Sequence, residues 1–227
     1  MNGPENGDGR RNEPAQDLCA RLCHDMVGPL GTVGAALDLL GEEPEAPALA
    51  QDAAAELRRR LKFWRAACGA GTGPLAVSGL TALLEGMLAG GRARLVAEAM
   101  PAERVLAAPV APLLLLGALL VGEALPRGGT VTLAPQGEGF VLRPEGAMRA
   151  RPAALPALLR GEAVEGARAA PALLLLRRPL PPAGGWRWRP SRSRTPCESP
   201  PEAEGTTFTF PSPSGPQAEP NPACRGP

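Results

Sequence analysis

Apolar residues recur at spacings of three and four over residues 16–40, and this pattern constrains the fold more than any other feature of the chain. They are Cys19, Leu22, Met26, Leu30, Val33, Leu37 and Leu40. The spacing predicts one stripe of a long helix that stops at Gly41. A second helical pattern follows the polar connection Glu42–Pro47 and runs over residues 48–68. The sequence therefore predicts a helical hairpin. Because two helices cannot enclose a core alone, a dimeric four-helix bundle is the economical solution.

Shorter and mixed elements begin after Gly69–Pro74 and predict a second domain. Helices are expected at 78–88, 110–125 and 151–160, and strands at 92–98, 104–107 and, as a pair, within 127–144. This order predicts an α+β protein with helices packed on one sheet. The expected divisions are a disordered tail at 1–14, the hairpin at 15–70, the second domain at 71–178 and a mostly irregular segment at 179–227. Within that last segment, Thr206–Phe210 is the one strand-like island.

Charge and composition exclude several classes of protein. The net charge of +1 gives no reason to expect nucleic acid or an anionic membrane as a partner. The apolar run Val110–Leu125 is interrupted by glycines and a glutamate and falls short of the roughly 20 residues of a membrane helix. Residues 1–14 have no apolar segment typical of a secretory signal. Five cysteines form no disulfide framework. A cytoplasmic protein is expected.

His24 is the only histidine of the chain and lies in LCARLCHDMVGPLG, residues 18–31. Because Leu22 and Met26 belong to the apolar stripe, residue 24, about 200° around the helix from residue 22, is predicted to face solvent. A structural histidine of the core would lie on the apolar side instead. An exposed imidazole is largely uncharged at neutral pH and can accept a phosphoryl group. By spacing alone, a phosphoacceptor and an incidental surface histidine are equally good interpretations.

The neighbours of His24 have types that suit phosphotransfer. The carboxylate of Asp25 can accept the Nδ1 proton of the imidazole and leave Nε2 outward. Arg21, one turn earlier, is predicted to contact phosphate oxygens. Gly28, one turn later, leaves room for an incoming domain to approach closely. Pro29 removes a backbone hydrogen bond and is predicted to kink the helix.

Three stretches together resemble the ChpT-type histidine phosphotransferases of bacterial two-component signalling. They are LCARLCHDMVGPLGTVGAALDLL at 18–40, RLKFWRAACGAG at 60–71 and LLLLGALLVGEALPRGGTVTL at 113–133. The resemblance implies a homodimer with His24 of each subunit on the flank of a four-helix bundle, followed by a degenerate histidine-kinase ATPase-like α/β sandwich domain. It also implies, as partners, receiver domains of a hybrid histidine kinase and of response regulators.

The sequence itself argues against ATP as the phosphoryl source. A working domain of the ATPase type needs an asparagine-bearing helix for magnesium and phosphates and an aspartate for adenine. The corresponding helix here, LLLLGALLVGEAL, has no asparagine, and no aspartate follows Asp52. Glu123 remains on that helix either as a relic or as a rim or capping residue. No intrinsic cofactor is therefore expected, and Mg²⁺ would come with the partner receiver domain.

Other features can be explained by packing or solvation as well as by function. Cys19 and Cys23 stand four apart, but zinc needs more donors, so packing of small residues is favoured and no metal site is expected. The arginines at 58–60 are either receiver contacts or a solvated helix face. Trp64 is expected to pack in the core or at the domain junction. For the whole chain, the rival functions are a non-catalytic dimerisation scaffold that has lost the relay and, third, an ATP-dependent histidine kinase.

Overall fold

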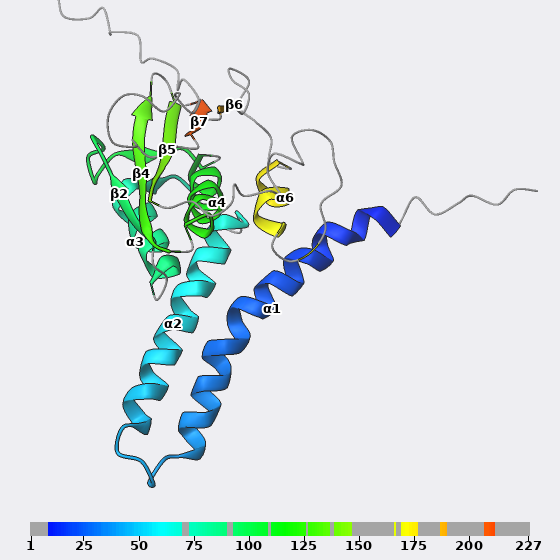
Figure 1. Ribbon diagram of the computed structural model, residues 1–227, viewed down its shortest axis with the longest axis vertical. Coiled ribbons are helices and arrows are strands. Elements are labelled where there is room, and N and C mark those ends of the chain that lie inside the picture. The colour runs from blue at the N-terminus through cyan, green and yellow to red at the C-terminus, as the bar shows by residue number, and fades with distance from the viewer. Residues whose placement is uncertain are drawn as a thin grey trace, which may run out of the picture.

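The computed structural model describes residues 9–69, 73–89, 93–108, 110–125, 127–136, 139–146, 166, 169–176, 187–189 and 207–211. Within these ranges the protein mixes helix and sheet, and an N-terminal helical hairpin projects from a small sheet domain (Figure 1). The α+β class predicted from the sequence is confirmed. No helix in the described part of the chain has both the length and the apolar character needed to cross a bilayer.

The hairpin consists of α1 (Gly9–Asp38) and α2 (Ala46–Ala67). The turn between them contains Gly41 with a φ of +93°, a left-handed conformation that glycine adopts without steric cost and that ends a helix. Pro47 lies in the first turn of α2, where its missing N–H has no intrahelical partner to lose. α1 begins before the predicted Gln16, and residues 9–14 belong to a helix instead of a disordered tail. The apolar stripe marks where a helix can be buried, and the helical backbone continues beyond it through polar residues.

The buried side of α1 differs from the predicted stripe. Arg21, Asp25, Pro29 and Ala36 are the buried residues described on this helix. Of the predicted stripe, Leu22, Met26 and Val33 are half-buried, whereas Cys19, Leu30, Leu37 and Leu40 are exposed. The reason lies in where α2 packs: Trp64 and Arg60 of α2 contact Asp25, so the side of α1 that carries Asp25 is covered and the predicted stripe lies partly outside this contact.

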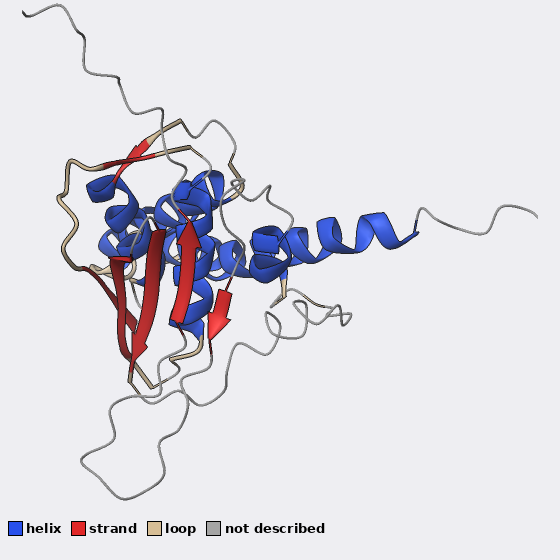
Figure 2. Cartoon of the chain, turned by 90° about the horizontal axis from the view of Figure 1, so that it is seen from above, coloured by secondary structure: helices blue, strands red, loops and turns tan. Residues whose placement is uncertain are grey.

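The second domain contains two sheets and three described helices. Its elements are β1 (Leu75–Ala76), α3 (Val77–Leu88), β2 (Ala93–Ala97), β3 (Val105–Leu106), α4 (Val110–Glu123), β4 (Gly129–Gln136), β5 (Gly139–Glu145), α6 (Ala170–Leu176), β6 (Arg187–Arg189) and β7 (Thr207–Pro211). β1 and β3 form a short antiparallel pair. The larger sheet has the order β2-β4-β5-β7-β6, in which β2 and β4 are parallel and the other pairs antiparallel. The helices cover one face of this sheet (Figure 2).

Helix α4 forms the centre of the core. Every residue from Val110 to Gly122 is buried, because α4 contacts the larger sheet on one side and helices α2, α3 and α6 on the others. The sheet contributes Leu95, Val131, Leu133, Phe140 and Leu142 to the same cluster. Phe63 and Trp64 of α2 also belong to it. The hairpin is therefore anchored to the second domain by a continuous apolar core.

Most predicted elements of the second domain are confirmed. The helices at 78–88 and 110–125, the strands at 92–98 and 104–107 and the strand pair within 127–144 correspond to α3, α4, β2, β3 and β4–β5. The expected helix at 151–160 lies outside the described residues. In the segment 179–227, the expected island corresponds to β7, but the expectation missed β6, because its residues 187–189 are surrounded by proline, glycine and arginine that disguise a strand. The two strands pair with each other and extend the larger sheet.

Candidate functional site

His24 lies midway along α1, and its side chain is 80 % exposed. The prediction that the imidazole faces solvent is confirmed. Its Nδ1 atom lies 3.3 Å from Oδ1 of Asp25, in reach of a hydrogen bond when Nδ1 carries the proton. Nε2 is then left with its lone pair. The sequence predicted this arrangement of the two side chains, and the structure brings them together as expected.

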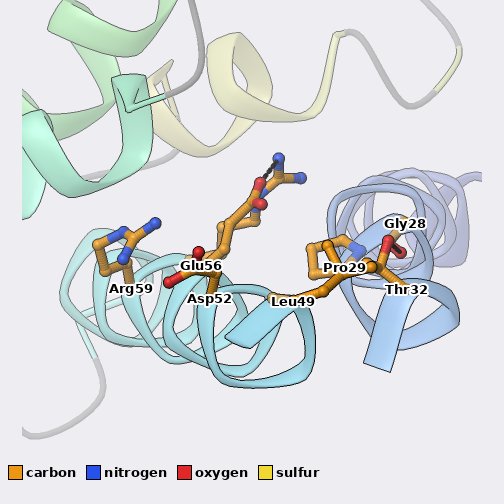
Figure 3. Close-up of a pocket in the computed structure, with 9 residues that line it drawn as sticks. Gly28, Pro29, Thr32, Leu49, Asp52, Glu56 and Arg59 are labelled. Atoms are coloured by element: carbon orange, nitrogen blue, oxygen red, sulfur yellow. Dashed lines mark hydrogen bonds and ion pairs between the residues drawn. The ribbon is translucent and has the colours of Figure 1, made fainter. Parts of the chain in front are cut away.

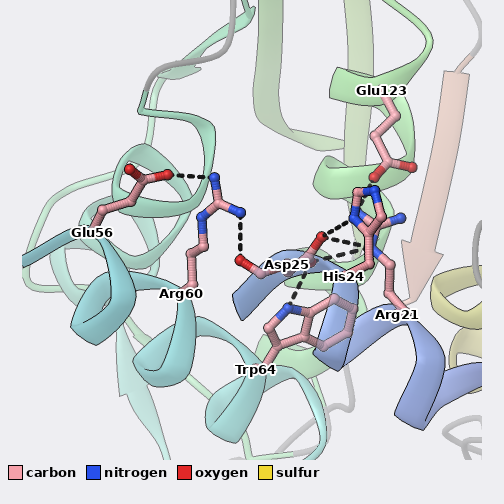
Figure 4. Close-up of polar contacts among 7 residues, drawn as sticks. All are labelled: Arg21, His24, Asp25, Glu56, Arg60, Trp64 and Glu123. Carbon is pink, nitrogen blue, oxygen red and sulfur yellow. Dashed lines mark hydrogen bonds and ion pairs between the residues drawn. The ribbon is translucent and has the colours of Figure 1, made fainter. Parts of the chain in front are cut away.

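The carboxylate of Asp25 is almost fully buried, and α1 and α2 both supply donors to it (Figure 4). Arg21 Nε lies 3.1 Å from both carboxylate oxygens. The indole Nε1 of Trp64, on α2, donates to Oδ2 at 3.0 Å. A buried charge without such partners would cost several kcal/mol. Asp25 is therefore fixed in place, and with it the acceptor that faces His24.

The guanidinium of Arg21 is enclosed by carboxylates on two sides. Besides Asp25 it binds Glu123, the last residue of α4, and it lies over the ring of Trp64 at 5.9 Å from the ring centre. Burial alone lowers the pKa of Arg21, but the hydrogen bonds and charges of Glu123 and Asp25 outweigh it, and the pKa is raised above its usual value. The predicted contact of Arg21 with phosphate stays a prediction. In this structure its Nε and one terminal nitrogen are occupied by carboxylates.

Pro29 lies on the buried side of α1 and leaves a gap in the backbone ladder. Having no N–H, it cannot donate to the carbonyl of Asp25, four residues earlier. Arg60 of α2 donates to that carbonyl at 2.5 Å and also binds Glu56 (Figure 4). The helix continues through Pro29 without interruption, and Figure 1 shows α1 curving away from α2 toward its N-terminus. Because Pro29 cannot donate to it, the carbonyl of Asp25 is available to Arg60, and this hydrogen bond connects the two helices beside the site.

A groove of about 550 Å³ runs between α1 and α2 just beyond the site (Figure 3). Gly28, Pro29 and Thr32 line it from α1; Leu49, Asp52, Ala53, Glu56, Arg59 and Arg60 line it from α2. Gly28 is exposed, and no atom lies within 4 Å of where a Cβ would stand. The predicted open approach at Gly28 agrees with this geometry.

Metal ligands do not gather at the site. Among the residues that the structure describes, no three His, Cys, Asp or Glu side chains are close enough together to hold a metal ion. Cys19 and Cys23 are both exposed free thiols. The favoured packing of small residues is not seen for these two cysteines in the described part of the chain, because both lie on an exposed side of α1.

Sequence reasoning missed the roles of Trp64, Glu123 and Arg60. Trp64 does lie at the domain junction, but its indole N–H also serves Asp25; a buried tryptophan needs such a partner, and this requirement was the available signal. For Glu123 the signal was a single carboxylate on an otherwise apolar helix. For Arg60 the signal was Pro29, one helical turn after Asp25, because a proline leaves the Asp25 carbonyl in need of another donor. We call Arg21, His24, Asp25, Trp64 and Glu123 the polar cluster below.

Comparisons with known proteins agree with this fold. Residues 78–177 match the family model described as the histidine phosphotransferase C-terminal domain. The protein phosphotransferase ChpT of Brucella abortus (strain 2308) is 32 % identical over 166 residues, which cover 65 % of this chain and 75 % of the relative. The solved structure of a bacterial phosphotransferase superimposes with a TM-score of 0.68 over 91 % of this chain and 98 % of the other. At 24 % identity that last match shows the fold alone.

Proposed function

The chain belongs to the family of ChpT-type histidine phosphotransferases, and on this premise we propose that His24 carries a phosphoryl group between receiver-domain aspartates in a cytoplasmic phosphorelay. Membership supports phosphotransfer within two-component signalling in general. The observation that supports His24 as the carrier is its geometry: one exposed imidazole, the single histidine of the chain, stands beside a buried and fixed carboxylate.

The transfer needs a free lone pair on Nε2 and a proton on Nδ1. Nε2 attacks the phosphorus of an aspartyl phosphate, a P–N bond forms, and the P–O bond to the donor carboxylate breaks with its electron pair on that carboxylate. The Nδ1 proton stays on the ring. Asp25 accepts a hydrogen bond from it and stabilises the positive charge that develops on the imidazole. Reversal toward a second receiver uses the same atoms.

The receiver domain supplies the rest of the machinery in this proposal. It brings the aspartyl phosphate and its Mg²⁺, and the histidine protein contributes the nucleophile in a fixed position. Gly28 and the groove beyond it leave space for a receiver beside His24.

Transfer without ATP fits the composition of α4. Its sequence VAPLLLLGALLVGE contains no asparagine or aspartate, and Glu123 is its one ionisable residue. That carboxylate binds Arg21 of the hairpin. We therefore propose that the second domain does not serve as a nucleotide-binding kinase domain.

A homodimer is the second part of the proposal. The hairpin exposes six leucines, Leu30, Leu37, Leu39, Leu40, Leu49 and Leu61, with 40 to 57 % of each residue accessible. We call them the exposed leucines of the hairpin. Because the hairpin extends beyond the second domain, a second copy can pack its own hairpin alongside and bury them in a four-helix bundle (Figure 1).

The test is phosphoryl labelling of the full chain by a receiver domain charged with radioactive phosphate. Wild-type protein is expected to acquire label, His24→Ala to acquire none, and ATP alone to label neither. Cys23→Ala, which changes an exposed neighbour, serves as the matched control and should be labelled like the wild type. Equal labelling of wild type and His24→Ala would refute the role of His24. Absence of label from every receiver tried, with the dimer intact, would favour the scaffold function instead.

A further inference from the structure

Glu123 occupies a position where an acidic residue is unfavourable by itself. It is the last residue of α4, and the negative end of the helix dipole disfavours a carboxylate there. All thirteen preceding residues of the helix are buried and apolar or glycine. Nothing in the packing of α4 requires a charge at its end. What Glu123 does contact is the guanidinium of Arg21, 102 residues earlier in the chain.

The contact connects the second domain to the imidazole through two intermediates. Glu123 binds Arg21, Arg21 binds both oxygens of Asp25, and Asp25 faces Nδ1 of His24 (Figure 4). Arg21 and Asp25 are both buried, so water competes little for their hydrogen bonds. His24 itself is exposed and makes one described side-chain contact, with Asp25. The orientation of the ring therefore depends on this chain of contacts.

We propose that Glu123 is a positioning residue for phosphotransfer, which holds Arg21 and thereby keeps Asp25 in the place that fixes His24 with Nδ1 protonated and Nε2 free. This inference rests on the proposed function of His24. Under this proposal the second domain does not bind nucleotide; through Glu123 it helps to keep the histidine reactive.

The chemical reason is the choice between two neutral tautomers of imidazole. When Nε2 carries the proton, the outward nitrogen has no lone pair and cannot attack phosphorus. An acceptor that faces Nδ1 favours the other tautomer. Loss of Glu123 leaves Arg21 with Asp25 as its only carboxylate partner among the described contacts. The guanidinium is then anchored by Asp25 and by the Trp64 ring alone, and Oδ1 of Asp25, the oxygen that faces Nδ1, depends on a less firmly held Arg21.

Two variants and one control separate positioning from folding. Glu123→Ala removes the contact, and Glu123→Gln removes the charge while it keeps an acceptor of the same size. Glu85→Gln changes an exposed glutamate of α3 for which the described residues show no ion pair. All are compared as the full chain, well below the unfolding midpoint of each variant. If Glu123→Ala fails to fold, Glu123→Gln carries the test.

The first readout is the rate constant of transfer from a phosphorylated receiver. At saturating receiver, Glu123→Ala is expected to transfer about tenfold more slowly, by analogy with the loss of activity when a residue that orients a metal-bound histidine is removed. The receiver concentration at half-maximal rate should not change, because Glu123 is proposed to act on the ring and not on docking. Glu123→Gln should fall between wild type and Glu123→Ala, and Glu85→Gln should match the wild type.

The second readout is the nitrogen NMR spectrum of the imidazole, which is unambiguous because the chain has one histidine. At a pH where the ring is neutral, the wild type is expected to show mainly the Nδ1–H tautomer, and Glu123→Ala an increased share of Nε2–H. A wild-type rate and spectrum in Glu123→Ala would overturn the proposal, and so would slow transfer with an unchanged spectrum. If no receiver labels the wild type, the proposed function fails, whereas the spectrum still decides whether Glu123 positions the ring.

Discussion

The hairpin and the second domain bury opposite kinds of residue. In the second domain, α4 buries a continuous run of leucine, alanine, valine and glycine against the sheet and its neighbouring helices. In the hairpin, α1 buries Arg21 and Asp25 while leucines such as Leu30 and Leu37 stay exposed. An apolar core gains stability from every buried side chain. A buried ion pair does not stabilise a fold reliably, because desolvation offsets much of its attraction.

The difference indicates that the two regions are shaped by different requirements. The described part of the second domain encloses the leucine-rich helix α4 within one chain. The hairpin retains buried charges beside an exposed histidine and leaves apolar surface without a partner, which is the pattern of a region that works through other molecules. The polar cluster at the junction joins the two, because Glu123 comes from α4 and the other members come from α1 and α2.

The largest loss of stability is expected from Arg21→Met, which removes the cation shared by two carboxylates. Breaking one side of a buried pair costs about 3–5 kcal/mol because the other charge stays buried and unpaired. The free energy of unfolding, measured by urea titration, should fall by that amount, whereas Arg65→Met on the exposed side of α2 should have little effect. A loss below about 1 kcal/mol would show that the hairpin does not depend on its buried charges.

Leu116→Ala tests the other region. Leu116 lies on α4 with none of its surface accessible, so the change removes buried apolar area and leaves a cavity. The expected cost is about 2–5 kcal/mol. Leu61→Ala removes the same atoms from a leucine of α2 that is 47 % exposed and should cost the single chain much less. Equal losses in the two variants, at a protein concentration where the chain is monomeric, would contradict the contrast between the regions.

A smaller effect is expected from Arg60→Met, which leaves the Asp25 carbonyl without a helical or side-chain donor. An unsatisfied backbone acceptor in a partly buried place costs about 1–2 kcal/mol. Pro29→Ala in the same background restores an N–H that can donate to this carbonyl and should recover part of the loss. Urea titration of the two variants measures both steps. Failure of the second change to recover stability would show that Arg60 acts through Glu56 alone.

The smallest effect on the single chain is expected from Leu37→Ser. Leu37 is 52 % exposed, and a surface substitution of this kind changes the free energy of unfolding by about 0.5 kcal/mol or less. If the exposed leucines of the hairpin form the dimer contact, association should nevertheless weaken clearly. Sedimentation velocity over a range of protein concentrations measures this. Unchanged association would place the dimer contact elsewhere or refute the dimer.

The sequence predicted the elements of both regions better than it predicted which side of α1 is buried. Apolar periodicity located α1, α2, α3 and α4, because in each of them the pattern repeats over several turns. It failed on the burial of Arg21 and Asp25, since their partners Trp64 and Glu123 lie 39 residues from Asp25 and 102 residues from Arg21, respectively. No local pattern can show that a charge will be neutralised from so far away. The exposure of His24 was predictable because Leu22 and Met26, which define the inner side near it, are indeed partly buried.

The most direct test of the role of the hairpin is to find which atom carries the phosphoryl group. After transfer from a charged receiver, phosphorus and nitrogen NMR of the full chain can assign the P–N bond, because a single histidine contributes imidazole signals. The phosphoryl group is expected on Nε2 of His24, with a proton retained on Nδ1. Phosphate on Nδ1, or on any residue other than His24, would contradict the claim that Asp25 holds this ring with its outer nitrogen ready to react.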